Sequence, residues 1–344
     1  MTTNEVPVRR ILSPAGQGKV GIAPGDTSQP DLVKLSKRAS QKVHGGSSSA
    51  SRNALQRALS VSIYALATLI GLTAFIYPFF TLSSQASVSA SQQMAHGSDS
   101  PLVLALLIGL CLAALAVEAQ GQALNAKLIA LLGILVAINS ALRLAEAVVR
   151  GPGGFSPVFM LIILCGYVFG SRFGFLMGIL TLLVSGIITG GVGPWLPYQM
   201  FTAGWMGMSA GWLGQVVAML SRMLPKRLTS QTSTSRASRL ELGPLLVYGV
   251  WWGFLYGAVM NLWFWPFQAG DPAQSWQAGL TFVQGVQRYA AFYLATSFVW
   301  DAFAAVGNIA MLVLFGLPTL KVLRRFKDRF LFTVDSHELA LEGT

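Results

Sequence analysis

The 49 residues between Arg172 and Arg222 carry no formal charge, and further uncharged runs lie at 58–98 and 242–270. A helix crosses the hydrocarbon core of a bilayer with roughly 20 apolar residues, so each run is long enough for at least one crossing. Only 11% of the residues are charged, whereas average soluble proteins carry charge on roughly 25% of positions. That is too little polar surface to cover a soluble core of this size. The sequence therefore predicts an all-α integral membrane protein.

Eight apolar segments are candidates for membrane spans. The fourth is short for a span, and because eight is an even number both termini are predicted to lie on the same side of the membrane. The segments lie at 58–81, 101–117, 128–149, 155–170, 173–192, 197–221, 243–266 and 289–319.

The distribution of Lys and Arg tests this count, because cytoplasmic connections of membrane proteins collect basic residues. With the N-terminus in the cytoplasm, 21 of the 24 basic residues fall on the cytoplasmic side, and only Arg143, Arg150 and Arg288 do not. The net charge of +11 is then explained by topology and by anionic lipid headgroups, so no nucleic-acid partner is predicted. We expect a multi-pass protein of the plasma membrane with cytoplasmic N- and C-termini.

Small residues recur at a spacing of three or four in three segments, and such residues let helix backbones approach closely in lipid. Packing inside the monomer is one interpretation of each pattern. Docking of a second membrane subunit is the other. The three patterns are Ala137, Ala141 and Ala145; Gly166, Gly170 and Gly174; and Gly207, Gly211 and Gly214.

Three ionisable residues fall at membrane depth, where charge is costly and is usually functional. Arg143 and Glu146 are three residues apart, so they share a helical face and can pair with each other. Snorkelling of both to the interface is the alternative. Asp301 either pairs with Arg143 to hold the bundle together or contacts a ligand.

Motifs for catalysis are weak. The stretch 207–211 matches a nucleophile elbow around Ser209, but the histidines, at 44, 96 and 337, lie outside the apolar segments and no Lys lies at mid-depth. An intramembrane hydrolase is therefore disfavoured, because its serine needs a base. There is no P-loop and no metal-ligand spacing. The chain is predicted not to be an enzyme and to hold no cofactor or metal, so any ATP hydrolysis belongs to a partner.

Aromatic and amide side chains remain as candidates for holding a ligand, since small-molecule sites are usually apolar cavities with a few polar groups. The helix-breaking stretch 190–197 is followed by residues that either line a pocket mouth or form an aromatic belt at the interface. The seventh and eighth segments are rich in Trp and Tyr. The candidate substrate-binding residues are Arg143, Phe155, Trp195, Tyr198, Gln199, Trp252, Tyr256, Asn261, Tyr293, Trp300 and Asp301.

Four stretches carry a family likeness. The sequence SPVF at 156–159 is followed by CGYVFGSRFG at 165–174 and by TGGVGPWLPYQM at 189–200, and the stretch 301–318 ends in Gly-Leu-Pro before a basic tail. Together they resemble the substrate-binding S components of energy-coupling factor (ECF) vitamin transporters, which are ABC importers. The likeness covers about residues 125 to 325.

The resemblance implies a six-helix bundle with cytoplasmic ends and a ligand cavity that opens to the outside. It implies that Ala137, Ala141 and Ala145 meet the transmembrane coupling (T) subunit and that partner ATPase subunits drive import. The ligand would be a vitamin, of the cobalamin branch or another cofactor precursor. The expected organisation is a disordered basic tail at 1–56, two additional transmembrane helices at 57–120, a substrate-binding core at 121–325 and a cytoplasmic tail at 326–344.

Two other functions remain open. A stand-alone secondary transporter or channel needs a titrating relay, for which Glu146 and Asp301 are the buried carboxylates. A scaffold would bind no small ligand.

Overall fold

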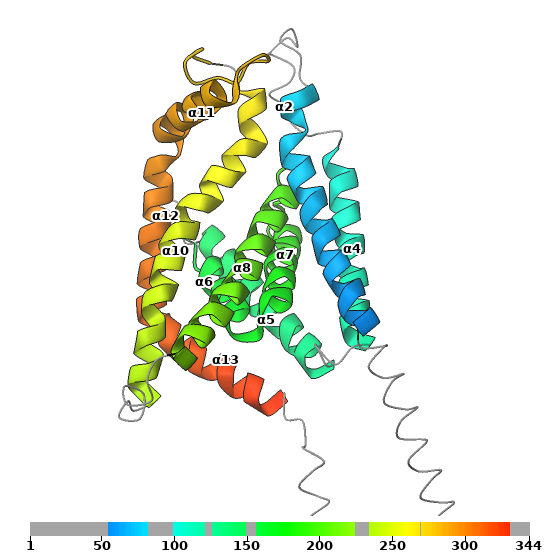
Figure 1. Ribbon diagram of the computed structural model, residues 1–344, viewed down its shortest axis with the longest axis vertical. Coiled ribbons are helices and arrows are strands. Elements are labelled where there is room, and N and C mark those ends of the chain that lie inside the picture. The colour runs from blue at the N-terminus through cyan, green and yellow to red at the C-terminus, as the bar shows by residue number, and fades with distance from the viewer. Residues whose placement is uncertain are drawn as a thin grey trace, which may run out of the picture. The chain divides into compact units, whose positions relative to one another are not determined.

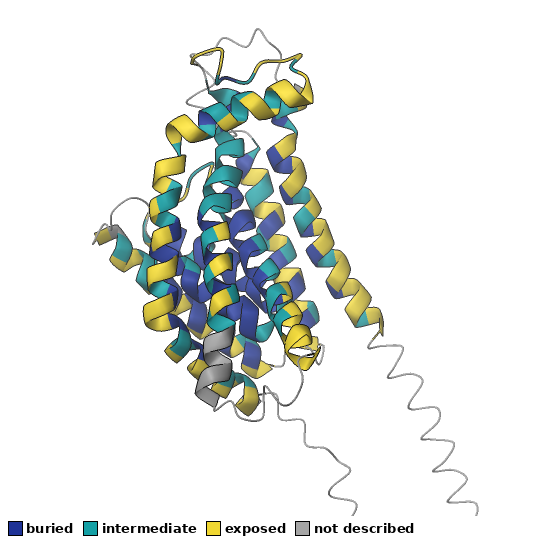
Figure 2. Ribbon diagram, turned by 60° about the vertical axis from the view of Figure 1, so that its left-hand side comes forward, coloured by how far each residue is buried: buried dark blue, intermediate teal, exposed yellow. Residues whose placement is uncertain are grey.

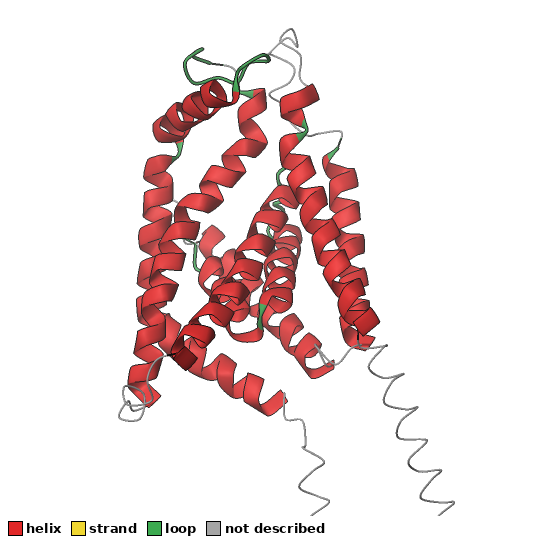
Figure 3. Cartoon of the chain, in the orientation of Figure 1, coloured by secondary structure: helices red, strands yellow, loops and turns green. Residues whose placement is uncertain are grey.

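The computed structural model describes residues 54–81, 99–120, 126–148, 156–223, 234–268 and 270–330. Within these ranges every regular element is helical (Figure 3). The predicted N-terminal tail up to residue 53, the candidate residue Phe155 and the end of the C-terminal tail lie outside the described residues.

The chain begins with an apolar helix that we call the N-terminal span, Ala54–Phe80, whose last turn is labelled α2 (Pro78–Thr81) (Figure 1). The elements that follow are α4 (Ser100–Gln120), α5 (Ala126–Val148), α6 (Val158–Phe169), α7 (Ser171–Ile188), α8 (Leu196–Met223), α10 (Thr234–Phe264), η1 (Trp265–Phe267), α11 (Phe282–Thr296), α12 (Phe298–Met311), η2 (Leu312–Gly316) and α13 (Leu317–Phe330).

Among the described residues, six helices are long and apolar enough to cross a membrane, rather than the eight expected. α6 is apolar but has only 12 residues. α8 has 28 residues, but its Gly, Trp and Gln content makes it less hydropathic than the others. The candidate spans are Ala54–Phe80, Ser100–Gln120, Ala126–Glu146, Ser171–Ile188, Glu241–Phe267 and Phe298–Arg329.

The prediction of a single segment from 289 to 319 was wrong at its start. A capping box, in which Thr281 accepts a hydrogen bond from the Gln284 backbone, begins α11. The helix ends at Thr296, whose hydroxyl bonds back to the Phe292 carbonyl at 2.8 Å, and Ser297 has φ −125°. Hydroxyl side chains of this kind compete with helical hydrogen bonding. The span therefore begins only at Phe298.

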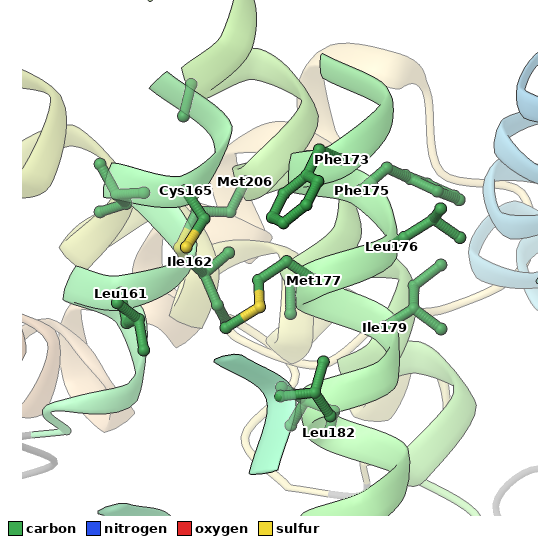
Figure 4. Packing of buried hydrophobic residues seen from close by; sticks show 14 of the residues in the cluster. Leu161, Ile162, Cys165, Phe173, Phe175, Leu176, Met177, Ile179, Leu182 and Met206 are labelled. Atoms are coloured by element: carbon green, nitrogen blue, oxygen red, sulfur yellow. The ribbon is translucent and has the colours of Figure 1, made fainter. Parts of the chain in front are cut away.

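The core lies where α6, α7 and α8 pack on one another (Figures 2 and 4). Gly170 has φ +97° and makes the sharp turn from α6 into α7. A methyl group added to Gly174 would overlap the carbonyl of Gly207, and one added to Gly207 would overlap the carbonyl of Gly174. The interpretation of these glycine patterns as packing inside the monomer is confirmed at Gly166, Gly174, Gly207, Gly211 and Gly214.

The alanine pattern of α5 has the opposite environment. Ala137, Ala141 and Ala145 are all exposed, and Ile134 and Ile138 beside them keep 58% and 49% of their surface exposed. The other face of α5 packs against α6 and α7. The alanine pattern is therefore an outer surface of this monomer.

The N-terminal span and α4 pack against α7 and α8. Tyr64 meets Phe175 edge-on at a ring-centroid distance of 5.4 Å, and Phe75 meets Tyr198 in the same way at 4.9 Å. On α4, the Ser100 hydroxyl donates to a backbone carbonyl of the α7–α8 turn at 2.9 Å. These contacts join the two additional helices to the core.

A buried ion pair joins the same helices near the other end of α4. Arg172, at the start of α7, donates to Glu118 at 3.0 Å, and the Glu118 side chain is 2% exposed. The hydroxyl of Ser60, on the N-terminal span, donates to the same carboxylate. Three helices therefore share one carboxylate.

The C-terminal helices turn at a π-helical segment. Asn308 on α12 donates to the Gly249 carbonyl of α10 at 2.9 Å, which holds the two helices together. After η2 the chain changes direction, and α13 runs across the lower end of the view in Figure 1. There the Lys327 amine donates to the Val168 carbonyl at 2.6 Å, and Arg324 pairs with Glu241. The basic α13 is thus attached to α6 and α10.

Candidate ligand cavity

A cavity of about 360 Å³ lies among six helices, α5, α6, α7, α8, α10 and α12. Its residues come from the C-terminal ends of α5, α7 and α10 and from the N-terminal ends of α6, α8 and α12. The predicted topology assigns all of these ends to the outer side. No residue of the N-terminal span or α4 lines this cavity. Its lining includes Arg143, Glu146, Ser156, Phe159, Leu182, Gln199, Tyr256, Gly257, Met260, Asn261, Ser297, Trp300 and Asp301.

One wall carries the charged residues of α5. The Arg143 guanidinium donates to the Ser185 hydroxyl of α7 at 3.1 Å. The Ser156 hydroxyl donates to the Glu146 carboxylate at 2.7 Å. Behind them the fully buried Asn139 donates to the Val158 carbonyl at 3.2 Å, which ties α5 to α6. Neighbouring helices therefore hold both charged side chains of α5.

The opposite wall carries Asp301. The Tyr293 hydroxyl of α11 donates to its carboxylate at 2.8 Å, and Gly257 of α10 faces it so closely that an added methyl group would overlap the carboxylate. α11 lies outside the candidate spans, and burial together with the Asp301 hydrogen bond raises the pKa of Tyr293. The phenol therefore stays protonated and acts as the donor.

The expected ion pairs of Arg143 do not form. Within the described ranges, the ion pairs of the structure are Arg172 with Glu118 and Arg324 with Glu241. Arg143 instead bonds to a serine, and Asp301 bonds to a tyrosine. The cavity therefore holds two carboxylates and one guanidinium that are not neutralised by one another.

Aromatic and amide groups complete the lining. The Phe159 and Tyr256 rings pack at a centroid distance of 4.6 Å and join α6 to α10. Asn261 donates to the Ser297 hydroxyl at 2.7 Å. The buried Oε1 atom of Gln199 has no hydrogen-bond partner among the described residues. Because buried polar atoms are normally satisfied, this oxygen is free to accept a hydrogen bond from a ligand.

Six of the eleven candidate residues meet at this cavity. Tyr293 reaches it only through its hydrogen bond to Asp301. Three others lie elsewhere: Trp195 is 41% exposed in the turn before α8, the buried Tyr198 donates to Asp99, and the buried Trp252 packs beside Tyr248. The six are Arg143, Gln199, Tyr256, Asn261, Trp300 and Asp301.

Sequence reasoning left several lining residues out of the candidate set. Glu146 was singled out as ionisable but not as part of a site. Ser156 and Phe159 lie within the SPVF stretch that carries the family likeness, so that motif was a usable signal. Ser297 had no signal, because its role depends on the break between α11 and α12.

Ser209 lies in the middle of α8, not at a strand-to-helix turn of the kind that a nucleophile elbow needs. Its hydroxyl donates to the Trp205 carbonyl at 2.6 Å and lies 2.7 Å from the Tyr248 hydroxyl. Within the described ranges, no three His, Cys, Asp or Glu side chains come together as a metal site would require. The cavity is suited to binding a ligand through hydrogen bonds and charge.

Comparison with family models, with curated proteins and with solved structures finds no match for this chain. The fold and the cavity are those of a multi-span helical membrane protein.

Proposed function

We propose that this protein is the substrate-binding S component of an ECF-type importer, which captures a small cofactor precursor from outside and delivers it with T and ATPase subunits. The observation that carries the proposal is the cavity. It is lined from all six helices of the expected substrate-binding core and from neither additional helix. Its residues lie at the helix ends that the charge pattern assigns to the outside, where an importer must receive its ligand.

The stretches that resemble S components surround this cavity. SPVF supplies Ser156, Val158 and Phe159 to the lining, and the stretch 189–200 forms the α7–α8 turn and supplies Gln199. The stretch 165–174 makes the tight α6–α7 turn through Gly170. The likeness therefore coincides with the residues that shape and line the cavity.

Size and charge narrow the ligand. A cavity of about 360 Å³ is at the lower end of the roughly 300–1,000 Å³ range for small-molecule sites. Cobalamin, with its corrin ring and nucleotide loop, is far larger, so the volume favours the smaller alternative, another cofactor precursor. Glu146, Asp301 and the free oxygen of Gln199 are hydrogen-bond acceptors, against the single cation of Arg143. The favoured ligand is a small compound that carries a cationic nitrogen and several N–H donors.

We expect Asp301→Asn to weaken ligand binding by roughly 10- to 100-fold, the range for losing a hydrogen bond to a charged group. Asparagine can still accept the Tyr293 hydrogen bond, so the helices should stay in place. The measurement is equilibrium binding of a panel of cationic, zwitterionic, neutral and anionic vitamins and cofactor precursors to the purified protein. Asp271→Asn is the matched control, because Asp271 is an exposed carboxylate in the loop before α11.

The panel also tests the function itself. If no compound binds at micromolar or lower concentration, and no coupling subunit copurifies, the S-component proposal fails. If a ligand binds wild type and Asp301→Asn equally well, the function survives but this cavity is not the site.

The exposed alanines of α5 are proposed as the contact with the T subunit. Ala141→Trp should reduce copurification of the T and ATPase subunits by at least tenfold, because an indole prevents the close helix approach that small residues permit. Ligand binding by the isolated protein should be unchanged. Ala113→Trp adds the same ring at an exposed position of α4 and should leave assembly intact.

Equal loss of ligand binding and assembly in Ala141→Trp would contradict this assignment, since it would mean that the alanines support the bundle itself. Normal assembly would contradict it as well.

A secondary transporter is the second candidate, favoured by the presence of two carboxylates in one cavity. Uptake by vesicles that contain this protein alone, driven by a proton gradient, would support it. Uptake that requires ATP and the partner subunits would support the S component.

A further inference from the structure

A second cavity, of about 810 Å³, lies on the other side of the core, between the N-terminal span, the α6–α7 turn and α8. It shares no lining residue with the ligand cavity. Most of its lining is apolar, and its charged residues are Arg57 and Arg172. We call it the arginine groove.

One stripe of the N-terminal span forms the length of the arginine groove. Arg57, Val61, Ala65, Leu69 and Leu72 all line it and recur every three or four residues, so they share one helical face. With a rise of 1.5 Å per residue, the stripe extends about 22 Å from Arg57 to Leu72. The hydrocarbon part of one leaflet is roughly 15 Å deep, half of a 30 Å core. The groove is therefore long enough to follow one leaflet from its surface to the bilayer centre.

The polar groups collect at one end of the groove. Ser171 and Arg172 begin α7, and Gln215 comes from the C-terminal half of α8. Ser60, one turn from Arg57, donates to Glu118, the ion-pair partner of Arg172, which places Arg57 and Arg172 at the same level. The charge pattern assigns this end to the cytoplasm.

These polar groups have donors to spare. Arg172 donates to Glu118 through one terminal nitrogen, which leaves other N–H groups of the guanidinium. Arg57 is exposed and has no ion-pair partner within the described ranges. The Ser171 hydroxyl is buried, also without a hydrogen-bond partner among the described residues. Arginine forks of this kind recognise phosphate oxygens.

We infer that the arginine groove binds one anionic phospholipid of the cytoplasmic leaflet. Its phosphate lies between Arg57 and Arg172, and an acyl chain runs along the stripe from Val61 to Leu72. The order from cations to apolar side chains matches the order from headgroup to chain, and the cytoplasmic leaflet carries the anionic lipids that attract arginines at the surface. The bound lipid covers the joint between the added N-terminal helix and the core. This inference does not depend on the proposed function.

The test is native mass spectrometry of the full chain, released from detergent with phosphatidylglycerol or phosphatidylcholine of equal chain length. Wild type should retain one phosphatidylglycerol in preference to phosphatidylcholine. Arg57→Gln should weaken phosphatidylglycerol binding about fivefold, the effect expected of one arginine near an anionic surface. Arg222→Gln is the matched control, because Arg222 is exposed in the last turn of α8, outside the groove.

A second pair of variants tests the acyl-chain part. Ala65→Trp fills the groove from an exposed position and should lower phosphatidylglycerol retention. Leu66→Trp adds the ring at a neighbouring side chain that is 48% exposed and outside the groove, and should not. Equal retention of the two lipids, equal effects of Arg57→Gln and Arg222→Gln, or displacement of the lipid by millimolar inorganic phosphate would overturn the inference.

Discussion

Arg172→Met is expected to destabilise the protein by about 3 kcal/mol, because removal of one partner from a buried ion pair leaves the other charge uncompensated. We take the lower end of the usual range because the Arg172 side chain keeps 31% of its surface exposed. Glu118 is 2% exposed, and its remaining partner, the Ser60 hydroxyl, carries no charge. For a protein of this size the apparent Tm should fall by roughly 6 to 12 °C. The measurement is thermal unfolding in detergent.

A double-mutant cycle separates the ion pair from a general effect of losing an arginine. Glu118→Gln keeps an acceptor for Ser60 but removes the charge, so the double variant Glu118→Gln/Arg172→Met should be more stable than Arg172→Met alone. Arg222→Met is the control for an exposed arginine and should change the Tm little. Additive losses in the cycle, or equal effects of Arg172→Met and Arg222→Met, would show that the pair does not hold these helices together.

The helical membrane fold could be predicted from charge-free runs, because hydropathy depends on composition more than on packing. The break at Ser297 could not. The residues on both sides of it are apolar and uncharged, and the helix ends through local hydroxyl bonding and the position of α11. α8 shows the opposite difficulty. It was predicted as a span from its length and lack of charge, but its core-packing glycines lower its hydropathy.

Part of the candidate site could be found because charge at membrane depth is rare. That rule led to Arg143 and Asp301, which line the cavity from opposite walls. Their actual partners, Ser185 and Tyr293, could not be deduced, because each lies on another helix at a register that only tertiary packing fixes. Glu118 was missed for a related reason: it follows the apolar segment 101–117, and its burial depends on the N-terminal span.

Aromatic residues were the least predictable. Trp252 and Tyr256 are four residues apart on α10, yet Trp252 is buried beside Tyr248 and Tyr256 lines the cavity. A helix that is apolar all round gives no moment from which its inward face can be read.

The small-residue patterns had similar spacing but opposite outcomes, and this contrast gives the prediction with the largest expected effect. Gly207→Leu should yield no folded protein. Its Cβ would overlap the Gly174 backbone carbonyl, and a carbonyl cannot move aside as a flexible side chain can. α7 and α8 would have to separate along the buried centre of the core, a loss above the 4–5 kcal/mol that marks exceptional substitutions. Gly207→Ala should still fold but lose about 1–3 kcal/mol, the usual cost of overpacking.

Gly133 is the matched control, because it lies in the middle of α5 with open space where a side chain would be added. Gly133→Ala should leave the Tm unchanged or raise it, since alanine favours a helix over glycine by roughly 0.5–1 kcal/mol. Gly133→Leu should also fold. Yield of monodisperse protein on size-exclusion chromatography and thermal unfolding in detergent measure both series. If Gly207→Leu folds as well as Gly133→Leu, α7 and α8 do not approach through Gly174 and Gly207, and the core described here is wrong at its centre.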